Sequence, residues 1–328
     1  MNWGNQTILV TGGTGSFGKA FIRTVLGELG PKKIIVYSRD ELKQHEMRHV
    51  DGFGDERIRW FIGDVRDLDR LRRAMAGVSI VVHAAAMKQV PACEYNPIEA
   101  VNTNINGAKN IIDAAIDCGV ERVLALSTDK AVSPVNLYGA TKLVAEKLFV
   151  QGNSYAGAGI TRFSCTRYGN VVGSRGSVVP LFLQQRASGL LTVTDDRMTR
   201  FWITLDQGVR LVIRGLEIMR GGEVFVPKIP SMRVADLARV VAPECRIEVV
   251  GIRPGEKLHE SLVSRDESRH TIELDDLYVI EPVQPWFGAR APLNGRAMTP
   301  DTEYTSDGNS AWLSSDEIRA MVREAGNA

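Results

Sequence analysis

The chain of 328 residues is 44% hydrophobic and 24% charged, with 40 Lys and Arg side chains against 39 Asp and Glu. The apolar share excludes disorder as the main state, and the near balance of charge excludes a global field that attracts nucleic acid or an anionic membrane. Four dispersed cysteines without a CxxC pair (Cys93, Cys118, Cys165 and Cys245) argue against a zinc site or a disulfide framework. With no leader-like N-terminus and no apolar run long enough to cross a bilayer, the sequence predicts a soluble, cytoplasmic protein.

Short β-branched runs alternate with longer helical patterns through the first half of the chain. The predicted strands cover residues 7–10, 33–37, 58–62, 80–83, 122–126 and 163–168. This alternation predicts an α/β fold of Rossmann type, a doubly wound parallel sheet with helices on both faces. After about Asn170 the rhythm becomes irregular. We therefore expect a dinucleotide-binding domain over residues 1–170, with further sheet segments near 200–228, and a smaller, partly interleaved substrate-binding domain over 171–328.

The first predicted strand passes into a helix through TGGTGSFG, residues 11–18. Glycines at this spacing permit a tight turn and the close approach of a pyrophosphate to backbone amides, so the segment predicts a dinucleotide site. After the second strand, Arg39 with Ser38 suits the 2'-phosphate of NADP, whereas the alternative has Asp40 binding the ribose hydroxyls. The predicted cofactor-binding residues are Gly12, Thr14, Gly15, Ser16, Phe17, Gly18, Ser38, Arg39, Asp40, Glu41, Leu42, Lys43, Asp64, Val65, Ala84, Lys88, Tyr138, Lys142 and Val171.

Residues 45–49, HEMRH, match the HExxH pattern of zinc peptidases, in which two histidines one helical turn apart bind the metal. The match lies on the helix that directly follows the second strand of the predicted dinucleotide fold, and no later residue is marked as a third ligand. A solvated helix face is therefore the preferred interpretation, and no metal site is predicted.

The fifth strand leads into Thr128, Asp129 and Lys130, and Tyr138 and Lys142 follow on one face of a long predicted helix. A lysine near a phenol favours the phenolate, so we predict that the pKa of the tyrosine is lowered and that it takes a proton from a substrate hydroxyl as hydride leaves the carbon. The same lysine would hold the nicotinamide ribose. The Asp-Lys pair supplies an acid and a base for the loss of water, with a salt-bridged strand end as the alternative.

Five ordered motifs together resemble the inverting UDP-N-acetylglucosamine 4,6-dehydratases of the extended short-chain dehydrogenase/reductase superfamily. The motifs are TGGTGSFG (11–18), STDKAVSPVNLYGATK (127–142), RYGNVVGSRGSVVP (167–180), MTRFW (198–202) and RPGEKLHE (253–260). The resemblance implies bound NADP, UDP-N-acetylglucosamine as substrate and UDP-2-acetamido-2,6-dideoxy-β-L-arabino-hexos-4-ulose as product, the first step of pseudaminic acid synthesis. It also implies a homo-oligomer, since hexamers are known among the short inverting enzymes.

The resemblance further implies a role for each catalytic residue. Lys130 is the base at C5, and Asp129 is the acid that assists the loss of water. Tyr138 handles the proton of O4, and Thr128 aids by hydrogen bonding. The residues implied to bind substrate are Lys88, Asn170, Arg175, Gly176, Ser177, Val178, Val179, Thr192, Thr194, Arg253 and Glu256.

Retaining dehydratases typically read Thr-Asp-Glu where this chain reads Thr-Asp-Lys at residues 128–130, so the lysine favours the inverting type. A UDP-sugar 4-epimerase and a retaining 4,6-dehydratase stay open as alternatives with the same fold and cofactor. No residue is identified for the reprotonation of C5 from the opposite face.

Overall fold

The computed structural model describes residues 1–157, 159–173, 178–288 and 293–326 of the chain. Within these residues a ten-stranded sheet forms the centre of the fold. Its strands are β1 (Thr7–Thr11), β2 (Lys33–Ser38), β3 (Ile58–Ile62), β4 (Ile80–His83), β5 (Arg122–Leu126), β6 (Arg162–Thr166), β10 (Val224–Pro227), β14 (Thr271–Glu273), β15 (Leu277–Ile280) and β16 (Arg296–Ala297). They lie in the order β16-β14-β15-β10-β6-β5-β4-β1-β2-β3. The strands from β3 to β10 pair in parallel, and β15, β14 and β16 join one edge through antiparallel pairings.

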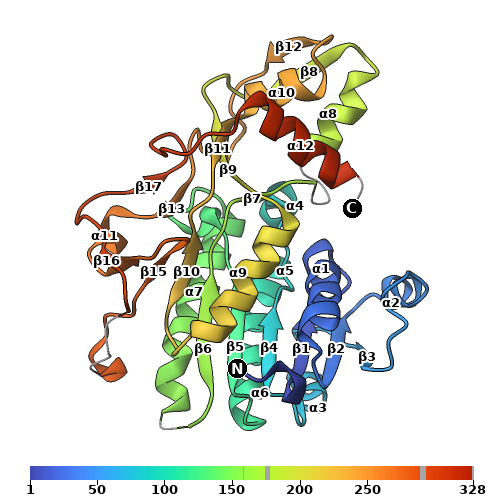
Figure 1. The fold of residues 1–328 in the computed structure, drawn as a ribbon, viewed down its shortest axis with the longest axis vertical. Coiled ribbons are helices and arrows are strands. Elements are labelled where there is room, and N and C mark those ends of the chain that lie inside the picture. Colours follow the sequence, from blue (N-terminus) through green and yellow to red (C-terminus); the bar gives the residue numbers. More distant parts are fainter. Residues whose placement is uncertain (158, 174–177, 289–292, 327–328) are drawn as a thin grey trace.

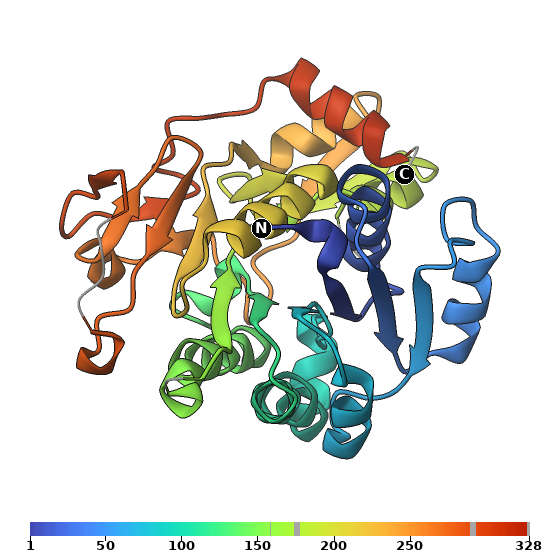
Figure 2. The ribbon, with the colours of Figure 1, turned by 60° about the horizontal axis from the view of Figure 1, so that its bottom comes forward.

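Helices cover both faces of this sheet (Figures 1 and 2). The helices of this part are α1 (Ser16–Thr24), α2 (Glu41–Arg48), α3 (Leu68–Met75), α4 (Val90–Tyr95), α5 (Pro97–Val101), α6 (Gly107–Asp117), α7 (Leu137–Ala156) and α9 (Leu205–Ile218). Successive strand residues point to opposite faces, so Ile8 and Val10 join the core beneath α1 and α9, whereas Leu9 joins the core beneath α3, α6 and α7. The predicted doubly wound parallel sheet is confirmed. No helix in the described ranges is long and apolar enough to span a lipid bilayer.

The first five predicted strands appear within one residue of the expected bounds. The sixth, expected over residues 163–168, ends at Thr166. The next residue, Arg167, still donates its amide to the carbonyl of Phe225 in β10 at 2.8 Å and places its side chain in a buried ion pair with Glu146 of α7.

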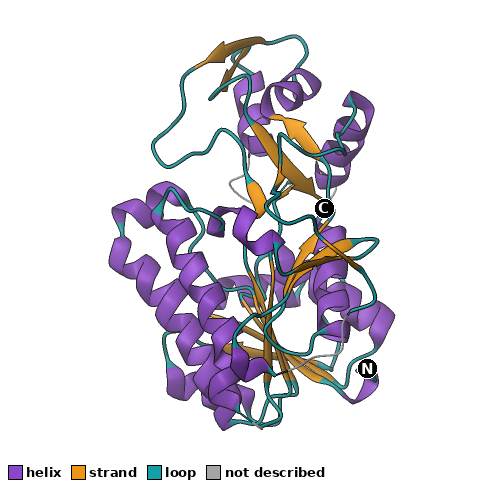
Figure 3. Ribbon diagram, turned by 90° about the vertical axis from the view of Figure 1, so that its left-hand side faces the viewer, coloured by secondary structure: helices purple, strands orange, loops and turns teal. Residues whose placement is uncertain are grey.

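Three small sheets and four helices make up most of the remaining structure, at the top of Figures 1 and 3 and beside the strand edge. The strands are β7 (Asn170–Val171), β8 (Leu190–Val193), β9 (Thr199–Ile203), β11 (Ser231–Arg233), β12 (Arg246–Val249), β13 (Ser261–Val263) and β17 (Tyr304–Thr305), and the helices are α8 (Val178–Arg186), α10 (Val234–Val241), α11 (Arg265–Ser268) and α12 (Ser315–Gly326). Phe182, Leu191, Trp202, Leu237 and Ile318 form part of a separate core among α8, α10 and α12.

The second half of the chain returns several times to the large sheet. β10 pairs with β6, and β14, β15 and β16 extend the same edge. Of the segment expected to add sheet strands near 200–228, β10 does so, whereas β9 belongs to the three-stranded sheet β11-β9-β7. The boundary between residues 170 and 171 stays a prediction, and the interleaving around it is wider than the sequence indicated.

Candidate active site

A cleft of about 1120 Å³ lies at the carboxyl ends of the parallel strands. Residues that directly follow β1, β2 and β5, among them Gly12, Arg39 and Thr128, line one side of it. Thr194 and Arg253 line it from the C-terminal part of the chain. Open parallel α/β sheets bind their ligands in the crevice at this edge, so the cleft is the candidate active site.

Most of the predicted site residues meet in this cleft. They are Gly12, Thr14, Gly15, Ser16, Phe17, Gly18, Ser38, Arg39, Asp40, Lys43, Asp64, Val65, Ala84, Lys88, Thr128, Lys130, Tyr138, Lys142, Asn170, Val171, Val178, Thr192, Thr194, Arg253 and Glu256. Three further predicted residues, Arg175, Gly176 and Ser177, lie outside the described residues.

Four predicted site residues of the described chain do not line the cleft. Glu41 and Leu42 are exposed on the first turn of α2, and their contact with the cofactor stays a prediction. Val179 is buried in the core beneath α8, and its side chain packs there rather than facing a substrate. Asp129 is fully buried and reaches the cleft through its contact with Lys130.

The turn between β1 and α1 fits a pyrophosphate. Gly12 has a φ of +66°, and a Cβ atom there would lie 3.0 Å from the backbone of Ala84 and Ala85. A Cβ atom on Gly18 would lie 2.5 Å from Gly13, which shows how closely α1 packs on the turn. No side chain caps the N-terminus of α1 at Gly15, so the first amides of this nine-residue helix are available to an anion.

Two charged residues after β2 bear on the choice of cofactor. Asp40 is the N-cap of α2, where its carboxylate accepts a hydrogen bond from the Lys43 amide at 3.0 Å and pairs with the Lys43 ammonium at 2.6 Å. These contacts hold the pKa of the Asp40 carboxyl below its usual value. The Arg39 guanidinium lies at the cleft, half-exposed, 3.6 Å from the carboxylate of Asp64. The Asp40 carboxylate, which the NAD alternative assigned to the ribose hydroxyls, thus serves as the cap of α2.

α7 presents Tyr138 and Lys142 to the cleft one helical turn apart. Burial lowers the pKa of Lys142, whose ammonium donates a 2.6 Å hydrogen bond to the carbonyl of Leu126 at the end of β5. Burial raises the pKa of Tyr138 to about 12, although the charge of Lys130 and a hydrogen bond with Thr128 act in the opposite direction. The structure therefore corrects one expectation. The cation that favours the phenolate is Lys130 rather than Lys142, and burial outweighs it.

The helix that carries Tyr138 packs directly on the turn that carries Lys130. A Cβ atom at Gly139 would lie 2.1 Å from the carbonyl oxygen of Lys130. The Gly139 amide donates to the side chain of Asn136, the N-cap of α7, at 2.7 Å. Because the contact leaves no room for a side chain, Lys130 and Tyr138 have a fixed spacing.

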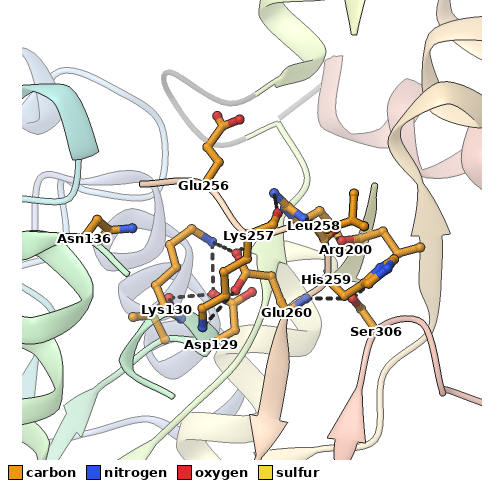
Figure 4. Close-up of polar contacts among 12 residues, drawn as sticks. Asp129, Lys130, Asn136, Arg200, Glu256, Lys257, Leu258, His259, Glu260 and Ser306 are labelled. Carbon is orange, nitrogen blue, oxygen red and sulfur yellow. Dashed lines mark hydrogen bonds and ion pairs between the residues drawn. The ribbon is translucent and has the colours of Figure 1, made fainter. Parts of the chain in front are cut away.

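Lys130 lies between two buried carboxylates (Figure 4). Its ammonium is 3.1 Å from Asp129 Oδ1 and 3.3 Å from Glu260 Oε1. Burial acts to lower the pKa of Lys130, but the two carboxylates outweigh burial and raise the pKa above its usual value. The Thr128 hydroxyl donates a 2.9 Å hydrogen bond to the same Asp129 oxygen. The resting Lys130 side chain is therefore an ammonium.

Sequence reasoning missed the other members of this cluster. Arg200 of β9 and Lys257 lie 3.8 and 3.7 Å from Glu260, and all three residues line the cleft. Asn136 donates to the carbonyl of Gly255 at 2.8 Å, which ties the segment 253–260 to the start of α7. Arg200 lies in the motif MTRFW, where it is a single charge in a strand-like run, and Lys257 and Glu260 lie in the highly charged motif RPGEKLHE.

The HExxH match has the geometry of a solvated helix face. His45 and His49 are both exposed on α2 and beside its C-terminus, with ring centroids 4.6 Å apart. The ring of His49 hydrogen-bonds the backbone carbonyl of His45 at 2.8 Å. The described part of the chain holds no group of three or more His, Cys, Asp or Glu residues that could hold a metal ion.

Residues 8–282 match the family described as polysaccharide biosynthesis protein. The chain belongs to this family. A family relative from Campylobacter jejuni (serotype O:23/36, strain 81-176), named UDP-N-acetylglucosamine 4,6-dehydratase (inverting), is 51% identical over 326 residues, which cover 97% of each chain. This similarity confirms the predicted resemblance and the assignment to an enzyme of the lyase class.

Other members and neighbours of the family carry different names. A Rickettsia canadensis relative named UDP-glucose 4-epimerase is 42% identical over 304 residues, covering 90% of this chain and 85% of the relative. The solved structure of Pen from Bacillus thuringiensis has a TM-score of 0.90 at 39% identity and covers 100% of both chains. DesIV from Streptomyces venezuelae, a dTDP-glucose 4,6-dehydratase solved with NAD and TYD bound, shares the fold at a TM-score of 0.68 and 24% identity, over 77% of this chain and 87% of its own.

Proposed function

We propose that the protein is an NADP-dependent inverting 4,6-dehydratase of UDP-N-acetylglucosamine. The observation that carries the proposal is the Lys130 ammonium 3.1 Å from the buried Asp129 carboxylate, in the same cleft as Tyr138 and Lys142. A plain dehydrogenase needs the tyrosine and its lysine but has no use for a second base beside a second acid. The product would be UDP-2-acetamido-2,6-dideoxy-β-L-arabino-hexos-4-ulose, which fits the start of pseudaminic acid synthesis.

The Lys130–Asp129 ion pair can supply both groups that the elimination requires. Transfer of one proton across the 3.1 Å contact converts ammonium and carboxylate into a neutral amine and a protonated carboxyl without net uptake of protons. The amine then takes the C5 proton, and the carboxyl gives its proton to the C6 hydroxyl, which leaves as water. Thr128, which donates to Asp129 at 2.9 Å, holds the carboxyl in place.

Tyr138 would accept the proton of the C4 hydroxyl as a phenolate, a form that the charge of Lys130 and the hydrogen bond with Thr128 favour and that burial opposes. A bound NADP would supply the hydride acceptor for C4 and the hydride donor for C6, so the reaction as a whole is redox-neutral. Lys142, fixed by its hydrogen bond to Leu126, would hold the nicotinamide ribose.

The preference for NADP is supported by the residues after β2. Asp40 is occupied as the cap of α2, and the Arg39 guanidinium stands at the cleft, where its paired donors suit a 2'-phosphate. The glycine turn before α1 fits the pyrophosphate of either dinucleotide.

The choice of sugar nucleotide rests on the name of the Campylobacter relative and on the far wall of the cleft. Arg253 and Lys88 line the cleft and can contact a diphosphate, while Thr192, Thr194 and Asn170 offer hydrogen bonds to sugar and uracil. A homo-oligomer in the cytoplasm is expected for this activity, and light scattering of the purified protein would report its size.

A UDP-sugar 4-epimerase is the second candidate, favoured by the 42% identity to the Rickettsia protein of that name. An epimerase oxidises and reduces C4 with the same tyrosine, lysine and cofactor. Its product has the mass of the substrate, whereas a dehydratase product is lighter by one water.

Incubation of the purified protein with UDP-N-acetylglucosamine in deuterated water tests the proposal. Mass spectrometry and proton NMR should show the loss of one water, a C6 methyl signal, deuterium at C5 and L-arabino couplings. A galacto-configured product of unchanged mass would identify an epimerase, and D-xylo couplings at the lower mass would identify a retaining dehydratase.

A further inference from the structure

Glu260 is a buried carboxylate that the proposed chemistry does not yet use. It ends the segment 253–260 and precedes β13, and its side chain is 2% exposed. Its backbone is fixed from both directions, because its amide donates to the Ser306 hydroxyl at 2.9 Å and its carbonyl accepts from the Ser306 amide at 2.8 Å. The fully buried Ser306 therefore determines where this carboxylate lies.

Three cations surround the Glu260 carboxylate. Each of them also has another acceptor: Arg200 donates to the carbonyls of Thr199, Leu258 and Lys257, Lys257 donates to the carbonyl of Val132, and Lys130 donates to Asp129 at 3.1 Å. Of the three, Lys130 lies closest to the carboxylate, at 3.3 Å, against 3.7 Å for Lys257 and 3.8 Å for Arg200.

The two carboxylates beside Lys130 also share a feature. Asp129 Oδ2 and Glu260 Oε2 are both buried without a hydrogen-bond donor among the described residues. A buried polar atom without a partner costs free energy, so its retention points to a use. Both atoms belong to carboxylates beside the Lys130 amine, and in the proposed reaction this amine must gain and lose a proton (Figure 4).

We infer that Glu260 is a positioning residue for Lys130: it orients the amine toward C5 of the substrate and stabilises the ammonium that forms when Lys130 takes the C5 proton. The inference rests on the proposed dehydration. When the C–H bond breaks, its electron pair stays on the substrate next to the C4 ketone, and the proton forms a new bond to Nζ. At that moment Asp129 is protonated, so Glu260 is the carboxylate that faces the new charge.

A purely structural role for Glu260 predicts a different outcome. If Glu260 were only a counterion of Arg200 and Lys257, its removal would disturb the cleft as a whole. Substrate binding, C4 oxidation and water loss would then fall together. As a positioning residue for Lys130, its loss affects the steps from C5 deprotonation onward. The two roles can thus be separated by measuring the steps individually.

The experiment compares wild type, Glu260→Gln and Glu260→Asp with UDP-N-acetylglucosamine. The first half-reaction is followed in a single turnover by the absorbance of reduced NADP at about 340 nm, and the second by water loss in mass spectrometry and by deuterium entry at C5. Glu248→Gln, an exposed glutamate of β12, is the control.

Glu260→Gln should keep the rate of C4 oxidation and the KM within about threefold of wild type, while water loss and deuterium entry fall roughly 10- to 100-fold, as for the loss of one group that stabilises a developing charge. Reduced NADP then accumulates. Glu260→Asp keeps a negative charge among the three cations but moves the carboxylate back by one methylene, so its water loss should fall about tenfold, between the other two.

Unchanged water loss in either variant overturns the inference, and so does a parallel fall of KM, oxidation and water loss. If Glu260→Gln does not fold, Glu260→Asp carries the test by the same criteria. The wild-type arm reports separately on the proposed function. Absence of a lighter product there refutes the dehydration itself, whatever the variants do.

Discussion

In the proposed function Arg39 carries the preference for NADP, because the Asp40 carboxylate, which would otherwise bind the ribose, caps α2. Guanidinium and phosphate form charge-assisted hydrogen bonds, which contribute about 1.5 to 3 kcal/mol each. The Arg39 side chain is 58% exposed, so solvent screens part of this contribution. The proposed preference for NADP can therefore be tested at this one arginine.

Arg39→Ala should raise the Kd for NADP about 10- to 100-fold and change the Kd for NAD by less than about threefold, since a lost energy of about 1.4 kcal/mol corresponds to a tenfold loss of affinity. Titration calorimetry with both dinucleotides measures the two constants. Arg48→Ala, at the far end of α2, is the matched control and should leave both unchanged. Equal weakening of NAD and NADP by Arg39→Ala would speak against a contact with the 2'-phosphate.

α7 is the element that joins cofactor, acid-base groups and substrate segment. It carries Tyr138 and Lys142, packs on the Lys130 turn through Gly139, and contacts Gly255 through its cap residue. Its N-terminus also receives a carboxylate from a neighbouring helix, since the Leu137 amide donates to Glu94 of α4 at 2.7 Å. A change at this end of the helix should therefore affect both stability and binding.

Asn136→Ala should lower the free energy of unfolding by about 1 kcal/mol through the loss of a helix cap, and should also raise the KM for the sugar nucleotide several-fold because the segment 253–260 is released. Ser314→Ala removes the cap of α12 and is the control. It should reduce stability by a similar amount and leave the KM unchanged. Thermal melts and steady-state kinetics on both variants measure the effects, and equal KM values would contradict the coupling.

Local sequence patterns predicted the bounds of the first strands, but they did not predict which strands pair across long distances in the chain. The strands at 58–62, 80–83 and 122–126 have the predicted bounds, because β-branched runs between turn residues are readable in sequence. The insertion of β10 between β6 and β15 was not readable, since pairing order depends on the path of the chain. For the same reason Arg200 and Glu260 were missed. Each lies in a conspicuous motif far along the chain from Lys130, and the fold brings them together.

At the scale of the whole molecule, one buried arginine links three separate parts. Arg167, directly after β6, contacts Glu146 of α7 at 3.1 Å, the carbonyl of Leu262 in β13 at 2.8 Å and Glu267 of α11 at 2.9 Å. Removal of one partner from a buried ion pair typically costs several kcal/mol, because the other charge stays buried. This cluster joins the large sheet and α7 to β13 and α11.

Stability should fall in acid through Glu267. Burial acts to raise the pKa of this carboxyl, but the charge and hydrogen bonds of Arg167 outweigh burial and lower the pKa from 4.5 to about 2. A folded-state pKa below the unfolded value stabilises the protein above about pH 4.5, by on the order of 3 kcal/mol, and this stabilisation is lost as the pH falls toward 2.

Melting temperatures of wild type and Glu267→Gln between pH 7 and pH 3 test this expectation. The variant should be less stable at pH 7, and the two curves should converge in acid. Glu303→Gln, which removes a more exposed carboxylate, should run parallel to wild type. Curves for Glu267→Gln that stay parallel down to pH 3 would contradict the role assigned to Arg167.

The return of late strands to an early sheet has a consequence for synthesis on the ribosome. The chain emerges from its N-terminus, so β6 is complete before its partner β10 exists, and its open edge must wait for that strand. The acid-base cluster waits longer still, because Ser306 anchors Glu260. Nascent chains that end before this serine can hold the nucleotide-binding strands and Tyr138, yet they lack the anchor of the carboxylate that faces Lys130. In the proposed mechanism, catalytic competence is thus among the last properties that the growing polypeptide acquires.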